Sequence, residues 1–121
     1  MGFKRAHEVI DWVHSFVHLG MKPGLERMEW LLERLNHPER HLKFVHIGGT
    51  NGKGSTLAFM RHVLSQAGYQ VGSFTSPYLN RFQERIQLNG KDIPDDALVR
   101  AASTLKPLVD ELAETELGPP T

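Results

Sequence analysis

The spacing of hydrophobic residues predicts two amphipathic helices at the start of the chain. Apolar side chains recur three or four positions apart, which places them on one helical face; they are Ala6, Val9, Ile10, Val13, Phe16 and Val17. Pro23-Gly24 interrupts this pattern, and a second helical set ends before Pro38; it comprises Leu25, Met28, Leu31, Leu32 and Leu35. We therefore expect helices over residues 4–19 and 25–36.

The next part of the chain has the pattern of two strands separated by a helix. The short apolar run Phe44-Val45-His46-Ile47 is typical of a strand, expected over residues 43–47. Helical spacing follows over residues 53–67 and stops at Gly68, a residue typical of helix ends. Residues 69–75 again have strand character. A βαβ unit over residues 43–75 would make the two strands parallel.

The last third of the chain combines a loop, a hairpin and a helix. Residues 76–84 show no periodicity, whereas residues 85–93 alternate as two strands around an Asn89-Gly90 turn. A helix with a bend at Pro107 is expected from Pro94 to residue 117, with one apolar face formed by Leu98, Ala101, Leu105, Leu108 and Leu112. This pattern predicts an α/β fold whose sheet is thin beside the typical size of about 5–6 strands. Because Gly118-Pro119-Pro120-Thr121 has the composition of a connector, we expect residues 1–121 to be the N-terminal part of a larger domain, with the remainder absent.

The segment between the first strand and the helix has the composition of a phosphate-binding loop; its residues are Gly49, Thr50, Asn51, Gly52, Lys53, Gly54, Ser55 and Thr56. Glycines allow backbone N–H groups to turn toward a phosphate, and the helix N-terminus adds partial positive charge. Lys53 would supply a full charge, and Ser55, or as second choice Thr56, a hydroxyl for Mg²⁺. A strict P-loop pattern requires glycine at position 47 and a hydroxyl at 54, where this chain has Ile47 and Gly54. We predict nucleoside triphosphate binding; the alternative is a glycine-rich surface loop.

Composition narrows the class of protein. The 121 residues carry a formal net charge of zero, which argues against nucleic acid or an anionic membrane as a partner. The chain contains no cysteine, so disulfides, thiolate catalysis and cysteine-bound zinc are excluded. It has neither a membrane-span pattern nor a signal-peptide core, and we expect a cytoplasmic protein. Two histidine pairs, His14 with His18 and His37 with His41, have helical spacing, but neither has a third ligand nearby, so solvated or packed histidines are expected.

Gly-Thr-Asn-Gly-Lys-Gly-Ser at residues 49–55 is followed, over residues 75–86, by Thr-Ser-Pro-Tyr-Leu and Arg-Phe-Gln-Glu-Arg-Ile. These two motifs together resemble the folylpolyglutamate synthase and dihydrofolate synthase family, within the Mur ligase superfamily. The resemblance implies a P-loop nucleotide-binding αβα domain of Mur-ligase type with two leading helices. It further implies an ATP- and Mg²⁺-dependent amide ligase that adds L-glutamate to folate or dihydropteroate through an acyl phosphate, with a monomeric parent enzyme.

The same resemblance implies roles for individual residues. Lys53 and the phosphate loop would bind ATP and stabilise the transferred phosphoryl group, and Ser76 would contact the metal with Ser55. The loop from Pro77 to Arg85 would face the folate, where Tyr78 and Phe82 could flank its ring. Arg85 could order the loop or meet a carboxylate. The same residues are also compatible with purely structural roles, in which Ser76-Pro77 forms a turn, both aromatic rings pack on the core, and Arg85 makes a structural ion pair.

Other functions stay open at this point. One alternative is a different P-loop enzyme, such as a Mur-type ligase or a small-molecule kinase, and another is a non-catalytic nucleotide-binding module. The resemblance places a further metal-binding acid and histidine, and a C-terminal domain, downstream of residue 121. We therefore expect the 121-residue chain to bind nucleotide at most weakly and to be inactive alone as a ligase.

Overall fold

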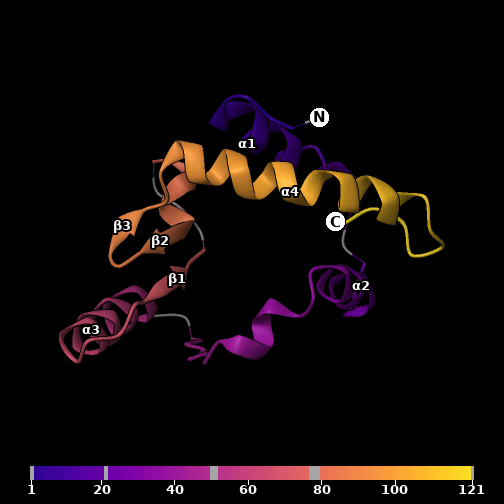
Figure 1. Cartoon of the computed structure of the whole chain (residues 1–121). Helices are drawn as coiled ribbons and strands as arrows, with labels where there is room; N and C mark the ends of the chain where they lie inside the picture. Colours follow the sequence, from indigo (N-terminus) through magenta and orange to yellow (C-terminus); the bar gives the residue numbers. More distant parts are fainter. Residues whose placement is uncertain (1, 21, 50–51, 77–79, 121) are drawn as a thin grey trace. The chain divides into compact units, whose positions relative to one another are not determined.

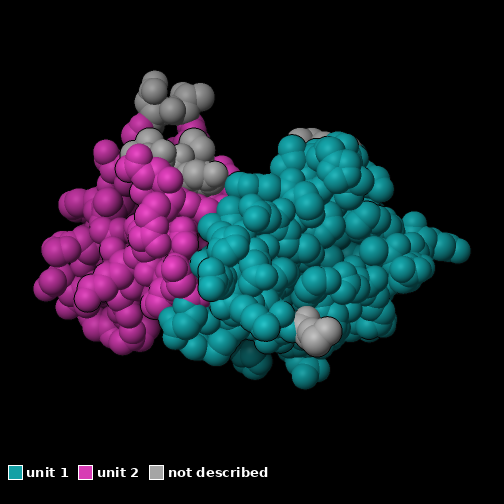
Figure 2. Space-filling view, turned by 90° about the horizontal axis from the view of Figure 1, so that it is seen from above, with its two compact units in different colours: residues 1–44, 96–121 teal, residues 45–95 magenta. Residues whose placement is uncertain are grey.

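The computed structural model describes residues 2–20, 22–49, 52–76 and 80–120. The chain divides into two compact units, residues 1–44 with 96–121 and residues 45–95 (Figure 2). The first unit is helical, and the second contains the sheet. No helix of the described residues has the length and apolar character required to cross a bilayer.

The first unit contains the two leading helices, both shorter than their hydrophobic patterns predict. Its elements are α1 (Ala6–His14), the single-turn helix η1 (Val17–Leu19), α2 (Glu26–Arg34), the short helix η2 (Pro38–His41) and α4 (Asp95–Ala113), whose first residue belongs to the second unit. α2 ends because Asn36 adopts a left-handed conformation (φ 61°). The N–H of His37 then donates to the carbonyl of Leu32 at 2.8 Å, a helix-ending motif that the Asn side chain tolerates.

The core of the first unit lies between α1 and α4, which run side by side (Figure 1). The N–H of Phe3, just before α1, donates to Ser103 Oγ on α4 at 2.9 Å. Buried side chains from the two helices are Ala6, Val9, Leu98, Ala102, Val109 and Leu112. The predicted α4 face therefore needs a correction: Ala101 is exposed, because the stripe that is buried passes through Ala102 and Val109. The helix continues through Pro107.

The second unit consists of one helix and a three-stranded antiparallel sheet. Its elements are α3 (Lys53–Gln66), β1 (Gly72–Phe74), the short helix η3 (Phe82–Arg85), β2 (Ile86–Leu88) and β3 (Lys91–Asp92). The strand order is β1-β2-β3, with Ser73 opposite Gln87 and Gln87 opposite Asp92. The turn between β2 and β3 lies at Asn89-Gly90, where φ is 52° and 84°, as the left-handed residues of a two-residue hairpin require.

The structure differs from the expected βαβ unit. Residues 42–49 contain neither helix nor strand, and β1 pairs antiparallel with β2 rather than parallel with an earlier strand. A strand forms only when another strand accepts its backbone hydrogen bonds, and no described segment pairs with residues 43–47. Phe44 consequently remains 71% exposed. The expected strand over residues 69–75 is also reduced to the three residues of β1.

Helix α3 is attached to the hairpin by a side-chain contact. Arg61 Nη1 donates to Gln87 Oε1 on β2 at 3.0 Å. The helix ends where Gly68 takes a φ of 97°, which lets the N–H of Tyr69 donate to the Leu64 carbonyl at 3.1 Å. These contacts fix α3 at both its middle and its end, and the candidate phosphate loop lies at its beginning.

Candidate functional site

The predicted phosphate loop ends at the start of α3, which begins with Lys53. Gly52, immediately before the helix, has a left-handed φ of 77°, and its carbonyl accepts the N–H of Thr56 at 2.9 Å. The first turn, Lys53 to Thr56, contains a lysine and no acidic residue, and no described side chain caps it. Its backbone N–H groups, the helix dipole and the Lys53 ammonium therefore all favour an anion at this end.

Backbone conformation favours glycine at two positions of this segment and does not at two others. Gly49 and Gly52 have φ values of 129° and 77°, which disfavour any side chain. Gly48 and Gly54 have no such conformation, and a β-carbon on either would meet no described heavy atom within 4 Å. The packing of the chain does not require glycine at these two positions. Open space beside them is what a phosphate needs to approach the backbone closely.

Ser55 and Thr56, the predicted hydroxyl pair, lie in the first turn of α3 and are exposed. Lys53 is exposed beside them. Thr50 and Asn51 lie outside the described residues. Six of the eight predicted nucleotide-binding residues thus occupy described positions at or just before the start of one helix.

The second predicted loop begins after β1 and returns through η3 to β2. At its start, the N–H of Thr75 donates to the carbonyl of Arg85 at 2.8 Å. Arg85 Nη2 donates to Ser76 Oγ at 3.1 Å, so two of the predicted site residues are in direct contact. Pro77 and Tyr78 lie outside the described residues. Ser76 is exposed, and its hydroxyl is held by the other end of the same loop.

Phe82 is buried, with 8% of its surface exposed, and the Arg85 guanidinium lies 5.7 Å from the centre of its ring. Of the two readings of Phe82 that the sequence left open, this burial favours a packed ring over one that flanks a ligand. The buried Phe82 ring therefore stabilises the loop by packing against its surroundings.

Three residues of this loop, Arg81, Gln83 and Glu84, make contacts that anchor it, although the sequence analysis assigned none of them an individual role. Gln83, 6% exposed, donates from Nε2 to Asp95 Oδ1 at 2.9 Å, and Arg81 Nη2 lies 3.5 Å from the same oxygen. Glu84 Oε1 accepts the N–H of Asn80 at 3.1 Å. Nothing in the pattern marks Gln83 as buried, because it lies in an aperiodic segment; Asp95 follows Pro94, a signal for the start of a helix only.

The described residues contain no group of three His, Asp or Glu side chains close enough to hold a metal ion. The hydroxyls of Ser55 and Ser76 are hard oxygen ligands of the kind that Mg²⁺ accepts, and this ion usually completes its shell with water and substrate phosphates. By its chemistry, each of these hydroxyls suits a cation that arrives with phosphate groups better than one held by protein carboxylates.

No family model matches the chain, whereas comparisons with individual known proteins find similar sequences and structures. Dihydrofolate synthase/folylpolyglutamate synthase of Bacillus subtilis is 47% identical over 119 residues, which is 98% of this chain and 28% of that protein. The crystal structure of folylpolyglutamate synthase from Thermotoga maritima has a TM-score of 0.81 and 39% identity, covering 94% of this chain and 27% of the other. A folylpolyglutamate synthase solved with AMPPCP and folate has a TM-score of 0.81 and 34% identity, covering 92% and 27%.

The chain matches a part of each of these longer proteins. The chain spans about 28% of the length of the Bacillus subtilis relative. The same share recurs in the structural comparisons, at 27% for each of the two solved chains. In this chain, the matched region consists of helices and a small sheet, in agreement with a Mur-ligase-type α/β domain. In sequence and in fold, the chain corresponds to the N-terminal part of the folylpolyglutamate synthase and dihydrofolate synthase family.

Proposed function

We propose that this chain provides the phosphate-binding part of an ATP-dependent amide ligase that joins L-glutamate to folate or dihydropteroate. The observation that carries the proposal is the start of α3, where Gly52, Lys53 and an uncapped first turn form an anion-binding end with open space at Gly54. The similarity to a folylpolyglutamate synthase solved with AMPPCP and folate supports nucleotide and folate as the ligands.

The proposed reaction has two steps. A carboxylate oxygen of the folate or pteroate attacks the γ-phosphorus of ATP, and the bond from that phosphorus to the β–γ bridging oxygen breaks. The products are an acyl phosphate and ADP. The amino group of glutamate then attacks the acyl carbon, the C–O bond to phosphate breaks, and the amine loses a proton as the amide forms. Inorganic phosphate leaves, so both steps balance without an oxidant or reductant.

In the first step, this chain's residues act by position and charge. The N–H groups of the first turn of α3 and the Lys53 ammonium would offset negative charge on the phosphates, which supplies most of the catalysis in phosphoryl transfer. Ser55 and Ser76 would hold Mg²⁺, which when bound neutralises phosphate charge. Residues 77–85 would cover the acceptor side, where the acyl phosphate must be kept from water.

Nucleotide binding by the 121-residue chain tests the phosphate site directly. AMPPCP titrated into the chain with Mg²⁺, followed by calorimetry, should give a measurable affinity that Lys53→Ala lowers about ten-fold or more, because a charged hydrogen bond contributes roughly 1.5–3 kcal/mol. Lys91→Ala is the matched control, since Lys91 is an exposed lysine of the same unit on β3. Equal affinities for the two variants would contradict the proposed site.

The ligase activity itself is tested separately. Glutamate-dependent ADP formation would be measured with dihydropteroate and with tetrahydrofolate as acceptors. We expect the 121-residue chain to bind nucleotide weakly and to show no turnover. Turnover by the isolated chain would overturn that expectation while leaving the phosphate site intact.

A further inference from the structure

Arg85 contacts the start of the Ser-Pro loop through both its backbone and its side chain. Its carbonyl accepts the N–H of Thr75 at 2.8 Å, and its Nη2 donates to Ser76 Oγ at 3.1 Å. Thr75 and Ser76 are adjacent residues at the end of β1, whereas Arg85 lies nine positions beyond Ser76, at the junction of η3 and β2. One residue therefore fixes both the backbone and the hydroxyl at the point where the loop leaves the sheet.

The direction of this hydrogen bond limits what the hydroxyl can do. A guanidinium only donates, so Ser76 Oγ is the acceptor and its own proton cannot be shared with Arg85. One lone pair of Oγ is occupied by Arg85. A hydroxyl also has a second lone pair, which can bind a cation, and a proton of its own.

Arg85 is itself held in place by its surroundings. Its Cζ atom lies 5.7 Å from the ring centre of Phe82, which is buried three residues earlier in η3. Its backbone is fixed where the Thr75 hydrogen bond joins β1 to the start of β2. A planar guanidinium held in this way sets the position of its partner oxygen more closely than a flexible lysine ammonium would.

We propose that Arg85 is a positioning residue that aims the Ser76 hydroxyl at the metal–nucleotide complex. This inference rests on the proposed function, because it assigns Ser76 Oγ to the cation bound with the nucleotide phosphates. It assigns Arg85 a role inside the protein, through the hydrogen bond from its guanidinium to Ser76.

The test uses the affinity of the 121-residue chain for AMPPCP, measured once with Mg²⁺ and once with EDTA. The ratio of the two affinities reports the metal-dependent part of binding. Ser76→Ala and Arg85→Met should each lower this ratio about three- to ten-fold, and the double variant should lower it no further, as for two residues acting through one contact. Arg85→Lys should restore part of the ratio, because it keeps the charge but not the fixed geometry.

Two controls separate positioning from charge and from folding. Lys91→Met removes one positive charge from an exposed position of the same unit, outside the loop, and should leave the ratio unchanged. Circular dichroism during urea unfolding should show that each variant still unfolds cooperatively. A purely structural role for Arg85 would weaken binding equally with and without Mg²⁺, leave the ratio unchanged, and so overturn the inference.

The remaining outcomes are also decisive. If Arg85→Met raises the ratio, the guanidinium opposes the cation, and the positioning role is wrong. If Arg85→Met and Ser76→Ala lower the ratio independently and their effects add, the two residues do not act through their contact. If the unmodified chain binds no nucleotide under either condition, the proposed function fails, and the inference that rests on it fails for that separate reason.

Discussion

Gln83 donates a hydrogen bond from Nε2 to Oδ1 of Asp95 at a distance of 2.9 Å. Gln83 lies in η3, within the loop that precedes β2, and Asp95 is the first residue of α4. The glutamine is 6% exposed, whereas 61% of the Asp95 side chain is accessible to water. This hydrogen bond joins the end of the loop to Asp95 at the start of α4, which follows the hairpin.

Replacing Gln83 by methionine should destabilise the chain by about 0.5–1.5 kcal/mol, because the substitution keeps the side-chain length and removes one hydrogen bond. Asp95 loses this donor but keeps Arg81 Nη2 at 3.5 Å and remains accessible to water, so no unpaired buried charge adds to this cost. The free energy of urea unfolding checks the value. Gln66→Met, at an exposed position at the end of α3, is the matched control and should change stability by less than about 0.5 kcal/mol. Equal effects at the two positions would show that the hydrogen bond contributes nothing.

Local signals in the sequence were sufficient for the turns, the helix ends and the β2–β3 hairpin, and insufficient for the pairing of the two strands expected before it. Asn89-Gly90 and Gly68 take the left-handed conformations that their residue types favour, so both could be predicted from neighbours in sequence. The strand expected at residues 43–47 could not be judged locally, because a strand depends on a partner that may be distant in sequence. Phe44 is of a residue type that is common in strands, but it lies outside the described strands and is exposed.

The residues of the candidate site likewise differ in whether local sequence signals could predict them. Lys53, Ser55 and the loop glycines belong to one contiguous motif at one helix start, so the sequence could predict them together. The contact between Ser76 and Arg85 joins residues nine positions apart through a chain reversal. The sequence identified both residues and offered several roles for Arg85. Gln83 belongs to the second motif, but nothing in the sequence marked it as buried, since only the fold buries it.

Gly54→Ala should separate folding from nucleotide binding. Gly54 lies in the first turn of α3, and an added β-carbon meets no described heavy atom within 4 Å. Alanine favours the helix over glycine by about 0.5–1 kcal/mol, so stability toward urea should rise. The same methyl group would occupy the space that a phosphate needs, and AMPPCP affinity should fall about ten-fold, equivalent to roughly 1.4 kcal/mol.

Ser65→Ala provides the control for this prediction. Ser65 is exposed near the other end of α3, and alanine there should leave nucleotide affinity unchanged while slightly favouring the helix. If Gly54→Ala binds AMPPCP as well as the unmodified chain does, the glycine is not required for phosphate approach, and the proposed geometry of the site is wrong.

The stability of the first unit should depend on the charge of Glu8. Its Oε1 accepts the backbone N–H groups of Lys4 at 2.9 Å and Arg5 at 2.8 Å, at the start of α1. These hydrogen bonds, that of Lys4 first, lower the pKa of the Glu8 carboxyl below its ordinary value. Because the folded pKa lies below the unfolded one, this stabilisation is complete above the unfolded pKa and is lost as pH falls through the folded pKa.

Comparison with Glu8→Gln isolates that effect. The unmodified chain should have a higher Tm than the variant near pH 7, and the difference should shrink toward zero as pH is lowered to about 3. Glu33→Gln, at an exposed position in α2, serves as the control. A Tm difference at Glu8 that stays constant over this pH range would mean that the charge does not strengthen the two hydrogen bonds.

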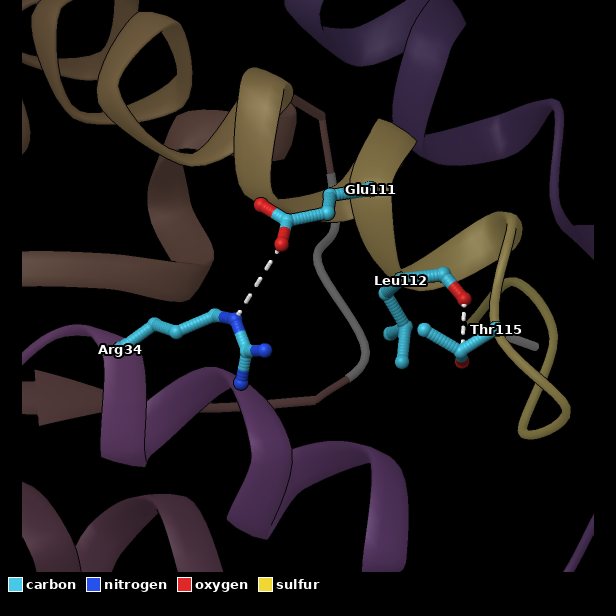
Figure 3. Close-up of polar contacts among 4 residues, drawn as sticks. All are labelled: Arg34, Glu111, Leu112 and Thr115. Atoms are coloured by element: carbon cyan, nitrogen blue, oxygen red, sulfur yellow. Dashed lines mark hydrogen bonds and ion pairs between the residues drawn. The ribbon is translucent and has the colours of Figure 1, made fainter.

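Adjacent residues near the end of α4 should contribute to stability in very different amounts. Figure 3 shows Glu111 directed toward Arg34 of α2, with Glu111 Oε1 3.6 Å from Arg34 Nε, and the Leu112 carbonyl accepting Thr115 Oγ1 at 2.7 Å. Both partners of the ion pair are exposed, so water screens it and its value is about 0–1 kcal/mol. The Leu112 side chain is instead completely buried, with 0% of its surface exposed.

Leu112→Ala should therefore lower the free energy of unfolding by about 2–5 kcal/mol, through lost burial and the cavity that remains. Glu111→Gln should lower it by less than about 0.5 kcal/mol, with the small difference reduced further by added salt. Leu25→Ala supplies the matched control, because Leu25 belongs to the same unit and is exposed. Urea unfolding of the three variants measures all these values. Equal costs for Leu112→Ala and Leu25→Ala would mean that α4 does not hold the core of the first unit, because burial of Leu112 would then contribute nothing beyond what an exposed leucine contributes.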